Sequence, residues 1–376
     1  MRIVIPRERA PSERRVAMTP AAIGRLAGED LAFAVESGAG EAASFSDEEY
    51  REAGAEIAEG PEDLCREADV VLAVTGTGVG ENGSAASADL LPSRATLASL
   101  LRPHANPDLL ARLAERGVTA LSLELMPRTT FAQRMDALSA FSTVAGYSAV
   151  LRAAEALDKF FPMLTTAAGT IAPANVFVIG AGVAGLQAIA TARRLGAVVE
   201  AFDIRPAVKE QVQSLGAKFV EWEDGGEELE TESGYAVEVS EQKQEHERQL
   251  IAEHVAKSDV VITTALVPGR PAPRLITSDM VAAMRPGSVI VDLAGEAGGN
   301  CELSRPGETT VEQGVIVQAP LDLASSLPHH ASQMYARILS TLLGHLVRDG
   351  ELVIDLDDEI TNAICVTHDG KVRYSS

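Results

Sequence analysis

A glycine-rich motif in the middle of the chain has the residue types and spacing of a dinucleotide site. Gly180, Gly182 and Gly185 follow the apolar run 175–179 and open an apolar-faced helical pattern, and Asp203 ends the next apolar run. The first glycine permits a tight turn, the second lets a pyrophosphate approach the backbone at a helix N-terminus, and the third lets helix and strand pack closely. Asp203 would accept hydrogen bonds from ribose hydroxyls and repel a 2′-phosphate. This favours NAD(H) over NADP(H).

The same pattern extends the predicted nucleotide site to the helix start and to the ends of two further strands. Residues 264–266 end a strand at the expected carboxyl edge of the sheet, where small side chains let a nucleotide lie across them. A purely structural turn there is nearly as strong an interpretation, whereas a structural glycine turn at 180–185 is a weak one. The additional candidates are Val183, Ala184, Ile204, Arg205, Thr264, Ala265 and Leu266.

A second polar group lies in the segment 126–142, called the connector below. Its candidate catalytic residues are Arg128, Gln133, Asp136 and Ser139, and the last three share one face of a helical or near-helical segment. A glutamine can hold a carboxamide and a serine can donate to a carbonyl, but none of the four carries protons well at neutral pH. All seven histidines lie outside the glycine-rich and connector motifs. By spacing alone, a polar helix start is the favoured interpretation.

The elements that must position these residues alternate between strands and helices. In the first half, strands are predicted at 3–5, 31–35, 69–74 and 118–123, and helices begin after Thr19 and Asn106, each followed by proline. Ser46 and Glu49 have the spacing of a capping box, and residues 76–88 have the composition of a loop. Short connections between alternating elements are typical of a doubly wound parallel sheet.

A second strand-and-helix series follows a long helix predicted at 144–161 and a breaker-rich stretch at 165–174. We therefore predict an α/β protein with two Rossmann-like doubly wound domains joined by long helices. The expected N-terminal domain is 1–137 plus a C-terminal return at 327–376, and the expected NAD(H)-binding domain is 138–326. Within the second domain, residues 221–249 hold eleven acids against two basic residues, which predicts a mobile surface loop leading into a helix.

Composition excludes several classes of protein. The 376 residues are 46% hydrophobic and carry a net charge of −22, so the chain is globular and an extended surface for nucleic acid or anionic lipid is disfavoured. The three cysteines, Cys65, Cys301 and Cys365, form no disulfide or zinc pattern, and no metal site is expected. No stretch of 18 residues lacks polar or charged interruption, so this chain is not expected to span a membrane.

The chain resembles, over nearly its whole length, the NAD-binding component (domain I, alpha subunit) of proton-translocating NAD(P) transhydrogenase. It is more distantly similar to alanine dehydrogenase, which shares the fold. The likeness is carried by IPRERAPSERRVAMTP, ELMPRTTFAQRMDALS, GAGVAGLQAIATARRLGA and MRPGSVIVDLAGEAGGN. The resemblance implies that Arg128, Gln133 and Asp136, with Ser139, form a loop that holds the nicotinamide. It also makes Gly234 and Tyr235 part of a mobile loop that closes over the bound nucleotide.

The resemblance accounts for the missing proton carrier. Hydride would pass directly from NADH on this chain to NADP(H) on a partner subunit, so no substrate proton moves. It further implies a homodimer, a membrane-spanning subunit that translocates protons, no nucleic acid, and a cytoplasmic location on the inner face of the cell membrane through the partner subunits.

Two alternatives remain open. Alanine dehydrogenase needs an Arg, a Lys, a His and an Asp; Arg15 matches the first, but the other positions fall at Val74, Arg102 and Glu296, with His104 the nearby histidine. A non-catalytic NAD(H)-sensing module would keep the glycine motif and not need the connector residues. The chain also departs from the transhydrogenase pattern at Ala73–Val74, at Arg102–Asn106 and at Ala324–Ser326, where the family's arginine is absent. These changes have no physical explanation in the sequence.

Overall fold

The computed structural model describes residues 1–28, 30–76, 85–221, 241–266 and 271–375. They form two compact units: unit 1 is Met1–Phe141 with Ala324–Ser376, and unit 2 is Ser142–Leu323. The division expected from the sequence, 1–137 plus 327–376 against 138–326, differs from this one by a few residues at each boundary.

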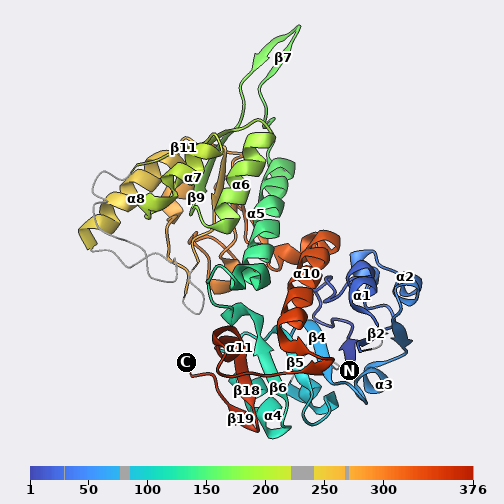
Figure 1. Ribbon diagram of the computed structural model, residues 1–376. Helices are drawn as coiled ribbons and strands as arrows, with labels where there is room; N and C mark the ends of the chain where they lie inside the picture. The colour runs from blue at the N-terminus through green and yellow to red at the C-terminus, as the bar shows by residue number, and fades with distance from the viewer. Residues whose placement is uncertain (29, 77–84, 222–240, 267–270, 376) are drawn as a thin grey trace. The chain divides into compact units, whose positions relative to one another are not determined.

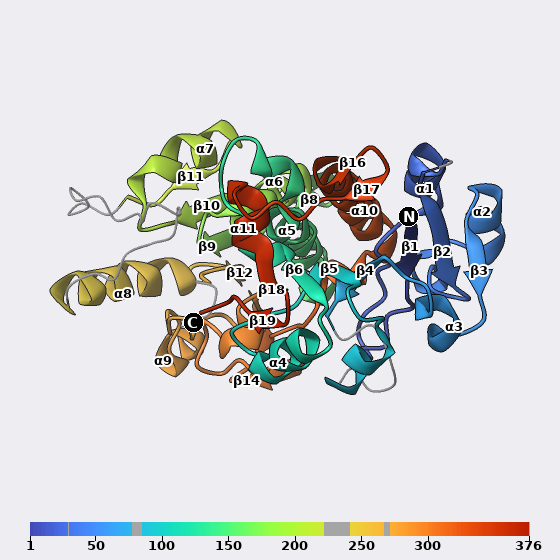
Figure 2. The ribbon, with the colours of Figure 1, turned by 60° about the horizontal axis from the view of Figure 1, so that its bottom comes forward.

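Unit 1 is built on an eight-stranded sheet in the order β19-β18-β6-β5-β4-β1-β2-β3, which Figure 2 shows from one edge to the other. Strands β1 to β6 run parallel, while β18 is antiparallel to β6 and β19 antiparallel to β18. The order reverses between β1 and β4, as in a doubly wound fold. The strands are β1 (Arg2–Ile5), β2 (Ala32–Glu36), β3 (Glu56–Ala58), β4 (Val70–Thr75), β5 (Thr96–Leu100), β6 (Thr119–Ser122), β18 (Cys365–His368) and β19 (Lys371–Val372).

Helices of unit 1 bury their apolar sides against this sheet. In one core cluster, Leu109, Leu110 and Leu113 of α4 pack with Val71 and Leu97 of the strands. The predicted capping box is confirmed at α2, where the Ser46 side chain accepts from Glu49 N and the Glu49 carboxylate accepts from Ser46 N. The helices are α1 (Pro20–Leu26), α2 (Asp47–Glu52), α3 (Pro61–Cys65), α4 (Pro107–Glu115), α10 (Pro328–Leu346) and α11 (Glu359–Ile364). Short 3₁₀ turns are η1 (Glu41–Ala43), η3 (Ala85–Leu90), η4 (Leu123–Leu125), η5 (Ala132–Met135) and η8 (Leu323–Ser326), the last lying at the boundary with unit 2. A short hairpin of β16 (Val347–Arg348) and β17 (Glu351–Leu352) follows α10.

Unit 2 holds a seven-stranded sheet in the order β11-β10-β9-β12-β13-β15-β14. All neighbours pair parallel except β14, which is antiparallel to β15 at one edge. The order reverses between β9 and β12. The strands are β9 (Asn175–Ile179), β10 (Val198–Phe202), β11 (Lys218–Phe219), β12 (Val260–Thr263), β13 (Val289–Asp292), β14 (Thr309–Glu312) and β15 (Val315–Gln318).

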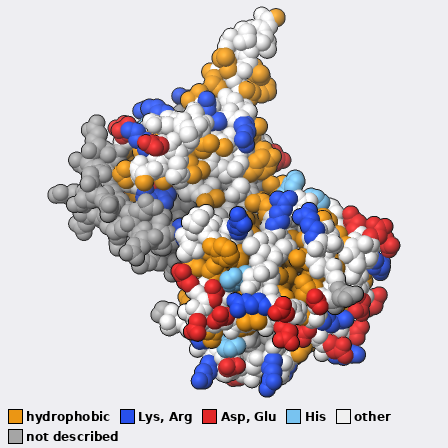
Figure 3. All heavy atoms as spheres, in the orientation of Figure 1, with side chains coloured by type: hydrophobic (Ala, Val, Ile, Leu, Met, Phe, Trp, Pro, Cys, Tyr) orange, Lys and Arg blue, Asp and Glu red, His pale blue; other side chains and the backbone are white. Residues whose placement is uncertain are grey.

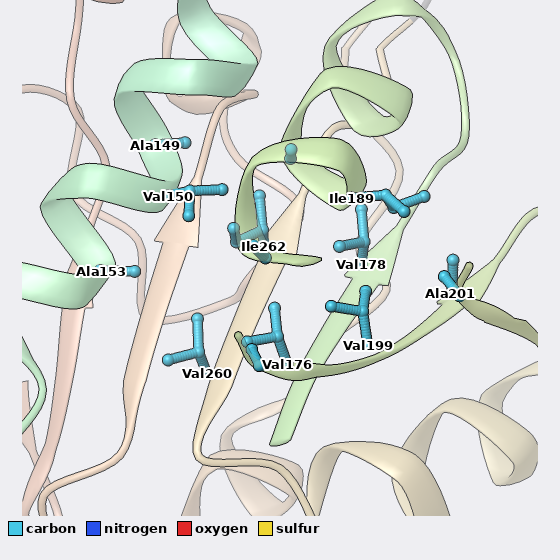
Figure 4. Close-up of a cluster of buried hydrophobic side chains, with 14 of the residues drawn as sticks. Ala149, Val150, Ala153, Val176, Val178, Ile189, Val199, Ala201, Val260 and Ile262 are labelled. Atoms are coloured by element: carbon cyan, nitrogen blue, oxygen red, sulfur yellow. The ribbon is translucent and has the colours of Figure 1, made fainter. Parts of the chain in front are cut away.

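One face of this second sheet is covered by α5 (Ala137–Ala156) and α6 (Val183–Arg194), and Figure 4 shows the apolar layer between them and the strands. Val150 of α5 and Ile189 of α6 meet Val176, Val178 and Ile262 there, all of them buried. Helix α5 begins in unit 1 and crosses into unit 2 at residue 142. The remaining elements are α7 (Lys209–Ser214), α8 (Glu241–Val255), α9 (Ser278–Ala282), η6 (Pro206–Val208) and η7 (Gly295–Ala297).

The predicted fold class is confirmed, since both sheets are mostly parallel and both have the Rossmann strand order. Several local predictions were wrong. The long helix begins at Ala137 because Asp136 caps it, and it ends at Ala156 rather than at 161. The breaker-rich stretch contains the hairpin of β7 (Leu164–Thr166) and β8 (Gly169–Ile171), strand β5 was missed, and η3 extends into the predicted loop 76–88.

Two kinds of feature do not occur in the described residues. No helix among them is long and apolar enough to cross a membrane. No cluster of three histidine, cysteine or acidic side chains in the described ranges is arranged to hold a metal ion.

Candidate functional site

The turn after β9 has the geometry that its glycines require. Gly180 has φ +95°, and a Cβ on it would lie 2.6 Å from Thr264 Oγ1. A Cβ on Gly185 would lie 1.9 Å from the Gly180 carbonyl oxygen, so only glycine lets α6 start this close to the strand. A Cβ on Gly182, by contrast, would meet only Arg205 Nη2 at 4.0 Å. The backbone at the start of α6 is therefore open to a ligand such as a pyrophosphate.

Residues 264–266 lie across the point where the strand order reverses. Thr264 follows β12, and its hydroxyl donates to the Gly180 carbonyl at 3.1 Å. The Asn300 side chain holds the next residue, accepting from Ala265 N at 3.1 Å and donating to Ala265 O at 2.8 Å. Asn300 is fully buried, and sequence reasoning missed it as a site residue. The signal was present in GEAGGN, a loop that ends in a polar residue after two glycines.

Asp203 is buried at the end of β10 and makes four hydrogen bonds within its own loop. Its Oδ2 accepts from Ala181 N at 2.7 Å and from Arg205 Nη2 at 2.9 Å, and its Oδ1 accepts from Arg205 N and Nε, both at 2.9 Å. The carboxylate therefore ties the glycine turn to the loop after β10. Because Arg205 occupies both oxygens, ribose hydroxyls would reach Asp203 only if the guanidinium gave up a bond.

A second carboxyl group lies near this end of the turn. Glu247 belongs to α8, and burial raises its pKa to about 7, with the negative charge of Asp203 raising it further. Two acids close to one another disfavour any further negative charge at this position. The described end of the site that would face a ribose is accordingly acidic, with Arg205 as the nearby positive charge.

The connector residues lie in unit 1. Arg128 and Gln133 are exposed, and Gln133 belongs to η5, whose ends are marked by bonds from Gln133 N to Thr129 O at 3.1 Å and from Asp136 N to Gln133 O at 3.4 Å. Asp136 leaves the helical conformation with ψ 94° and caps α5, accepting from Ser139 N at 2.9 Å and from Ser139 Oγ at 2.5 Å. The expected shared helical face is thus broken at Asp136, which pairs with Ser139 instead.

The structure brings the predicted residues together in two sets, one in each unit. Unit 2 holds the glycine turn, Asp203 to Arg205 and Thr264 to Leu266 at the carboxyl edge of its sheet. Unit 1 holds Arg128, Gln133, Asp136 and Ser139. Gly234 and Tyr235 lie outside the described residues. Among described residues, the stretches 180–182, 203–205, 264–266 and 293–297 that follow the strands of unit 2 contain no histidine or lysine.

Unit 1 carries a pocket of about 370 Å³ after β1 and β2, lined by charged residues that include Arg7 and Arg14. Glu8 reaches across the sheet there and accepts from Val74 N and Thr75 Oγ1, both at 2.6 Å. Burial raises the pKa of Glu8 to about 7, although the Thr75 and Val74 bonds oppose that shift.

Arg15 in the wall of this pocket is buried and paired within the pocket itself. Its Nε and Nη2 donate to Glu13 at 2.7 and 2.6 Å, and its guanidinium lies 4.1 Å from the centre of the Phe141 ring. Burial lowers the pKa of Arg15, but bonding to Glu13 raises it further than burial lowers it, so the guanidinium stays charged.

Two sheets with Rossmann strand order, one of them with a glycine turn and an aspartate after its second strand, define a dinucleotide-binding protein of the two-domain dehydrogenase type. Residues 4–145 match the family described as "Alanine dehydrogenase/PNT, N-terminal domain", and residues 149–375 match "Alanine dehydrogenase/PNT, C-terminal domain". The chain belongs to the alanine dehydrogenase/PNT family.

Three similar proteins show where in this family the chain lies. The first of the polypeptides that make up the NAD(P) transhydrogenase alpha subunit of Rhodospirillum rubrum is 45% identical, over 100% of this chain and 98% of the relative. A solved structure, "The crystal structure of transhydrogenase from Sinorhizobium meliloti", has a TM-score of 0.89 at 44% identity, covering 99% of this chain and 100% of that one. An alanine dehydrogenase of Halomonas elongata is 30% identical over 100% of this chain and 95% of the relative.

Proposed function

We propose that this chain is the NAD(H)-binding subunit of a proton-translocating NAD(P) transhydrogenase. Hydride passes directly from the nicotinamide of NADH on this chain to the nicotinamide of NADP⁺ on a partner subunit. The observation that carries the proposal is the likeness to transhydrogenase subunits over the whole chain, at 45% identity against 30% for the alanine dehydrogenase.

The chemistry of the described site supports direct hydride transfer. Oxidation of an alcohol or an amine releases a proton that a side chain must accept, and histidine or lysine normally does so. The connector residues 124–139 and the described carboxyl-edge stretches of unit 2 contain neither. Transfer between two nicotinamides moves no such proton, so the protein has only to orient the rings and hold them close.

Each predicted residue receives a role in this proposal. The backbone at Gly182 to Gly185 binds the pyrophosphate, and Asp203 and Arg205 meet the adenosine ribose. Thr264 to Leu266 lie along the nucleotide, and Val183, Ala184 and Ile204 line it. In the connector, Gln133 holds the nicotinamide carboxamide, while Asp136 and Ser139 fix the loop together with Arg128. Gly234 and Tyr235 belong to the segment that would close over the cofactor.

The deciding experiment mixes the purified chain with NADH, thio-NADP⁺ and an isolated NADP(H)-binding transhydrogenase subunit. We expect thio-NADPH to form only when this chain and the subunit are both present. NADH oxidation by this chain alone with pyruvate and ammonium would instead establish an alanine dehydrogenase. NADH binding with neither reaction would establish a sensing module.

The proposed complex has two further kinds of subunit, one that binds NADP(H) and one that spans the membrane and translocates protons. This chain would then work in the cytoplasm at the inner face of the cell membrane, held there by its partners. Co-purification of the three subunits from detergent-solubilised membranes, with this chain released at high salt, is the expected result.

We also propose that the chain forms a homodimer through the β7–β8 hairpin, which projects from unit 2 in Figure 1. A two-stranded hairpin has little stability alone, yet here Met163 and Ile171 are 60% and 44% exposed. No charged residue occurs from Phe160 to Asn175, and Figure 3 shows no acidic or basic side chain on the hairpin. Since the chain carries −22 charges, an uncharged apolar projection suits contact with a second copy.

Light scattering during size-exclusion chromatography tests this dimer. The double change Met163→Glu, Ile171→Glu should convert a dimer into a folded monomer because it buries like charges at the interface. Val311→Glu is the matched control, since Val311 is 68% exposed on the edge strand β14 of the same unit. A parent protein that is monomeric, or a hairpin variant that stays dimeric, would remove the hairpin from the interface.

A further inference from the structure

A histidine of the C-terminal return contacts the connector. His345 lies in the last turn of α10, and its ring centre is 6.0 Å from that of Phe131, with the two planes tilted by 56°. Phe131 is the residue directly before η5, the turn that contains Gln133. Both aromatic residues belong to unit 1, although 214 positions separate them in the chain.

His345 is itself fixed by a carboxylate. Its Nε2 donates to Asp358 Oδ2 at 2.9 Å, which places the proton on that nitrogen because the carboxylate only accepts. Asp358 also caps α11, accepting from Thr361 N at 2.8 Å. Burial alone raises the pKa of Asp358, but the bonds from Thr361 and His345 lower it to about 2, so Asp358 is a charged acceptor at neutral pH.

The connector has few interactions of its own to set its orientation. The turn η5 is four residues long, and 3₁₀ turns are weakly hydrogen-bonded. Its buried Ala132 and Met135 pack the turn against α10, and η4, just before the connector, packs against α11. Phe131 is 62% exposed, so burial does not fix its ring. The described aromatic contact that orients Phe131 is the one with His345.

We infer that His345 is a positioning residue for the nicotinamide-holding loop, acting through its contact with Phe131 and held in place by Asp358. The route runs from the cap of α11, through Asp358 and His345, to Phe131 and the turn that presents Gln133. The C-terminal return thus sets the geometry of hydride transfer without touching cofactor. The inference rests on the proposed function, because the role of Gln133 does.

The first experiment needs no hydride transfer. Amide hydrogen exchange of the peptide covering residues 129–136 reports the bonds from Gln133 N and Asp136 N. In His345→Ala we expect this peptide to exchange about tenfold faster, because the loop opens more often once its support is lost. Phe131→Ala should do the same. The double variant should match the singles, since both changes break one contact.

His329→Ala is the matched control. His329 lies near the start of the same helix, stacks on Phe45 with ring centres 4.5 Å apart, and bonds through Nδ1 to Ala43 O at 2.9 Å. It thus loses the same kinds of interaction at the other end of α10. Exchange at 129–136 should stay at the parent rate in this variant. Equal acceleration in both variants would mean general loosening of unit 1 and overturn the inference.

The second experiment measures the reaction. With the NADP(H)-binding subunit present, His345→Ala should transfer hydride about tenfold more slowly, while its affinity for NADH changes by less than about twofold. His345→Gln, which can still donate to Asp358 but has no ring, should restore thermal stability and not the rate. A parental rate in His345→Ala would refute the positioning role. If the parent itself transfers no hydride, the proposed function fails, and the exchange data alone decide whether His345 holds the loop.

Discussion

The two units share a strand order but differ in the residues directly after their first strand. After β9 in unit 2 comes a glycine turn, and the space beside Gly182 is open. After β1 in unit 1 comes Pro6-Arg7-Glu8, and the Glu8 carboxylate accepts from Val74 N and Thr75 Oγ1 at the end of β4. In each unit this is the point where the strand order reverses.

The difference shows which feature of a doubly wound fold makes a nucleotide site. The strand order creates a crevice in both units, but backbone donors attract a phosphate only where no side chain has already taken them. In unit 1 the carboxylate of Glu8 uses those donors. In unit 2 the Thr264 hydroxyl closes on the Gly180 carbonyl instead, and the N–H groups at the start of α6 are left for a ligand.

Gly185→Ala should produce the largest effect, because it removes the feature that separates the units. A Cβ there would lie 1.9 Å from a carbonyl oxygen. We expect loss of about 3 kcal/mol of stability and no measurable NADH binding, measured by urea unfolding and calorimetry. Gly24→Ala in α1 is the control, since its nearest neighbour would be at 3.8 Å. That change should stabilise the protein by up to about 1 kcal/mol. Normal binding by Gly185→Ala would mean that the turn rearranges freely.

Gln133→Asn tests whether unit 1 contributes orientation rather than binding. The side chain shortens by one methylene, so the amide no longer reaches the nicotinamide. We expect hydride transfer to the NADP(H)-binding subunit to slow by about a hundredfold, with NADH affinity within about threefold of the parent. Gln213→Asn on α7, another exposed glutamine, should have no effect. A parental transfer rate in Gln133→Asn would remove the connector from the reaction.

Asp203→Ala probes the ribose end of unit 2. Removing the carboxylate leaves Arg205 without its bidentate partner and able to meet a 2′-phosphate, so NADPH should bind about tenfold more tightly. Asp203→Ala with Arg205→Ala lacks both groups and should not gain NADPH affinity. Equal gains in the single and double variants, measured by equilibrium dialysis, would show that Arg205 plays no role in the choice between cofactors.

Glu8→Gln gives the smallest expected effect and tests the closed crevice of unit 1. Folding raises the pKa of Glu8 from 4.5 to about 7, so the folded chain keeps a proton that the unfolded chain has lost. Stability due to this group therefore falls as pH rises towards 7 and then levels off. Between pH 6 and 8 the parent should lose about 1 kcal/mol relative to the variant, measured by unfolding at each pH. Parallel pH profiles would place the Glu8 carboxyl in a more polar setting.

Sequence reasoning found the features of the site that depend on neighbouring residues. The glycine turn, Asp203 and the fold class follow from local spacing and from alternation of elements. It did not find contacts between distant residues. The bond from Glu8 to Val74 spans 66 positions, and the pair of Asp203 with Arg205 depends on how a long side chain turns back. The hairpin was missed because TTAAGTIAPA has little strand propensity and is held by no local core.

The connector was predicted only incompletely for a related reason. Spacing put Gln133, Asp136 and Ser139 on one helical face, but Asp136 ends the turn in order to cap α5. An aspartate at that place satisfies either pattern, and only tertiary packing chooses between them. Asn300 and His345 were overlooked because each acts on a residue far away in sequence, Ala265 in one case and Phe131 in the other.

Unit 1 is made of two pieces of chain, with all of unit 2 translated between them. Strand β18, which extends the sheet of unit 1 beyond β6, leaves the ribosome only after the whole of unit 2 has done so. We therefore expect unit 2 to fold first during synthesis, while β6 waits as an unpaired edge. The hydride-transfer loop, supported by α10 and α11, would then take shape after the nucleotide site, so that a nascent chain binds cofactor before it is competent for chemistry.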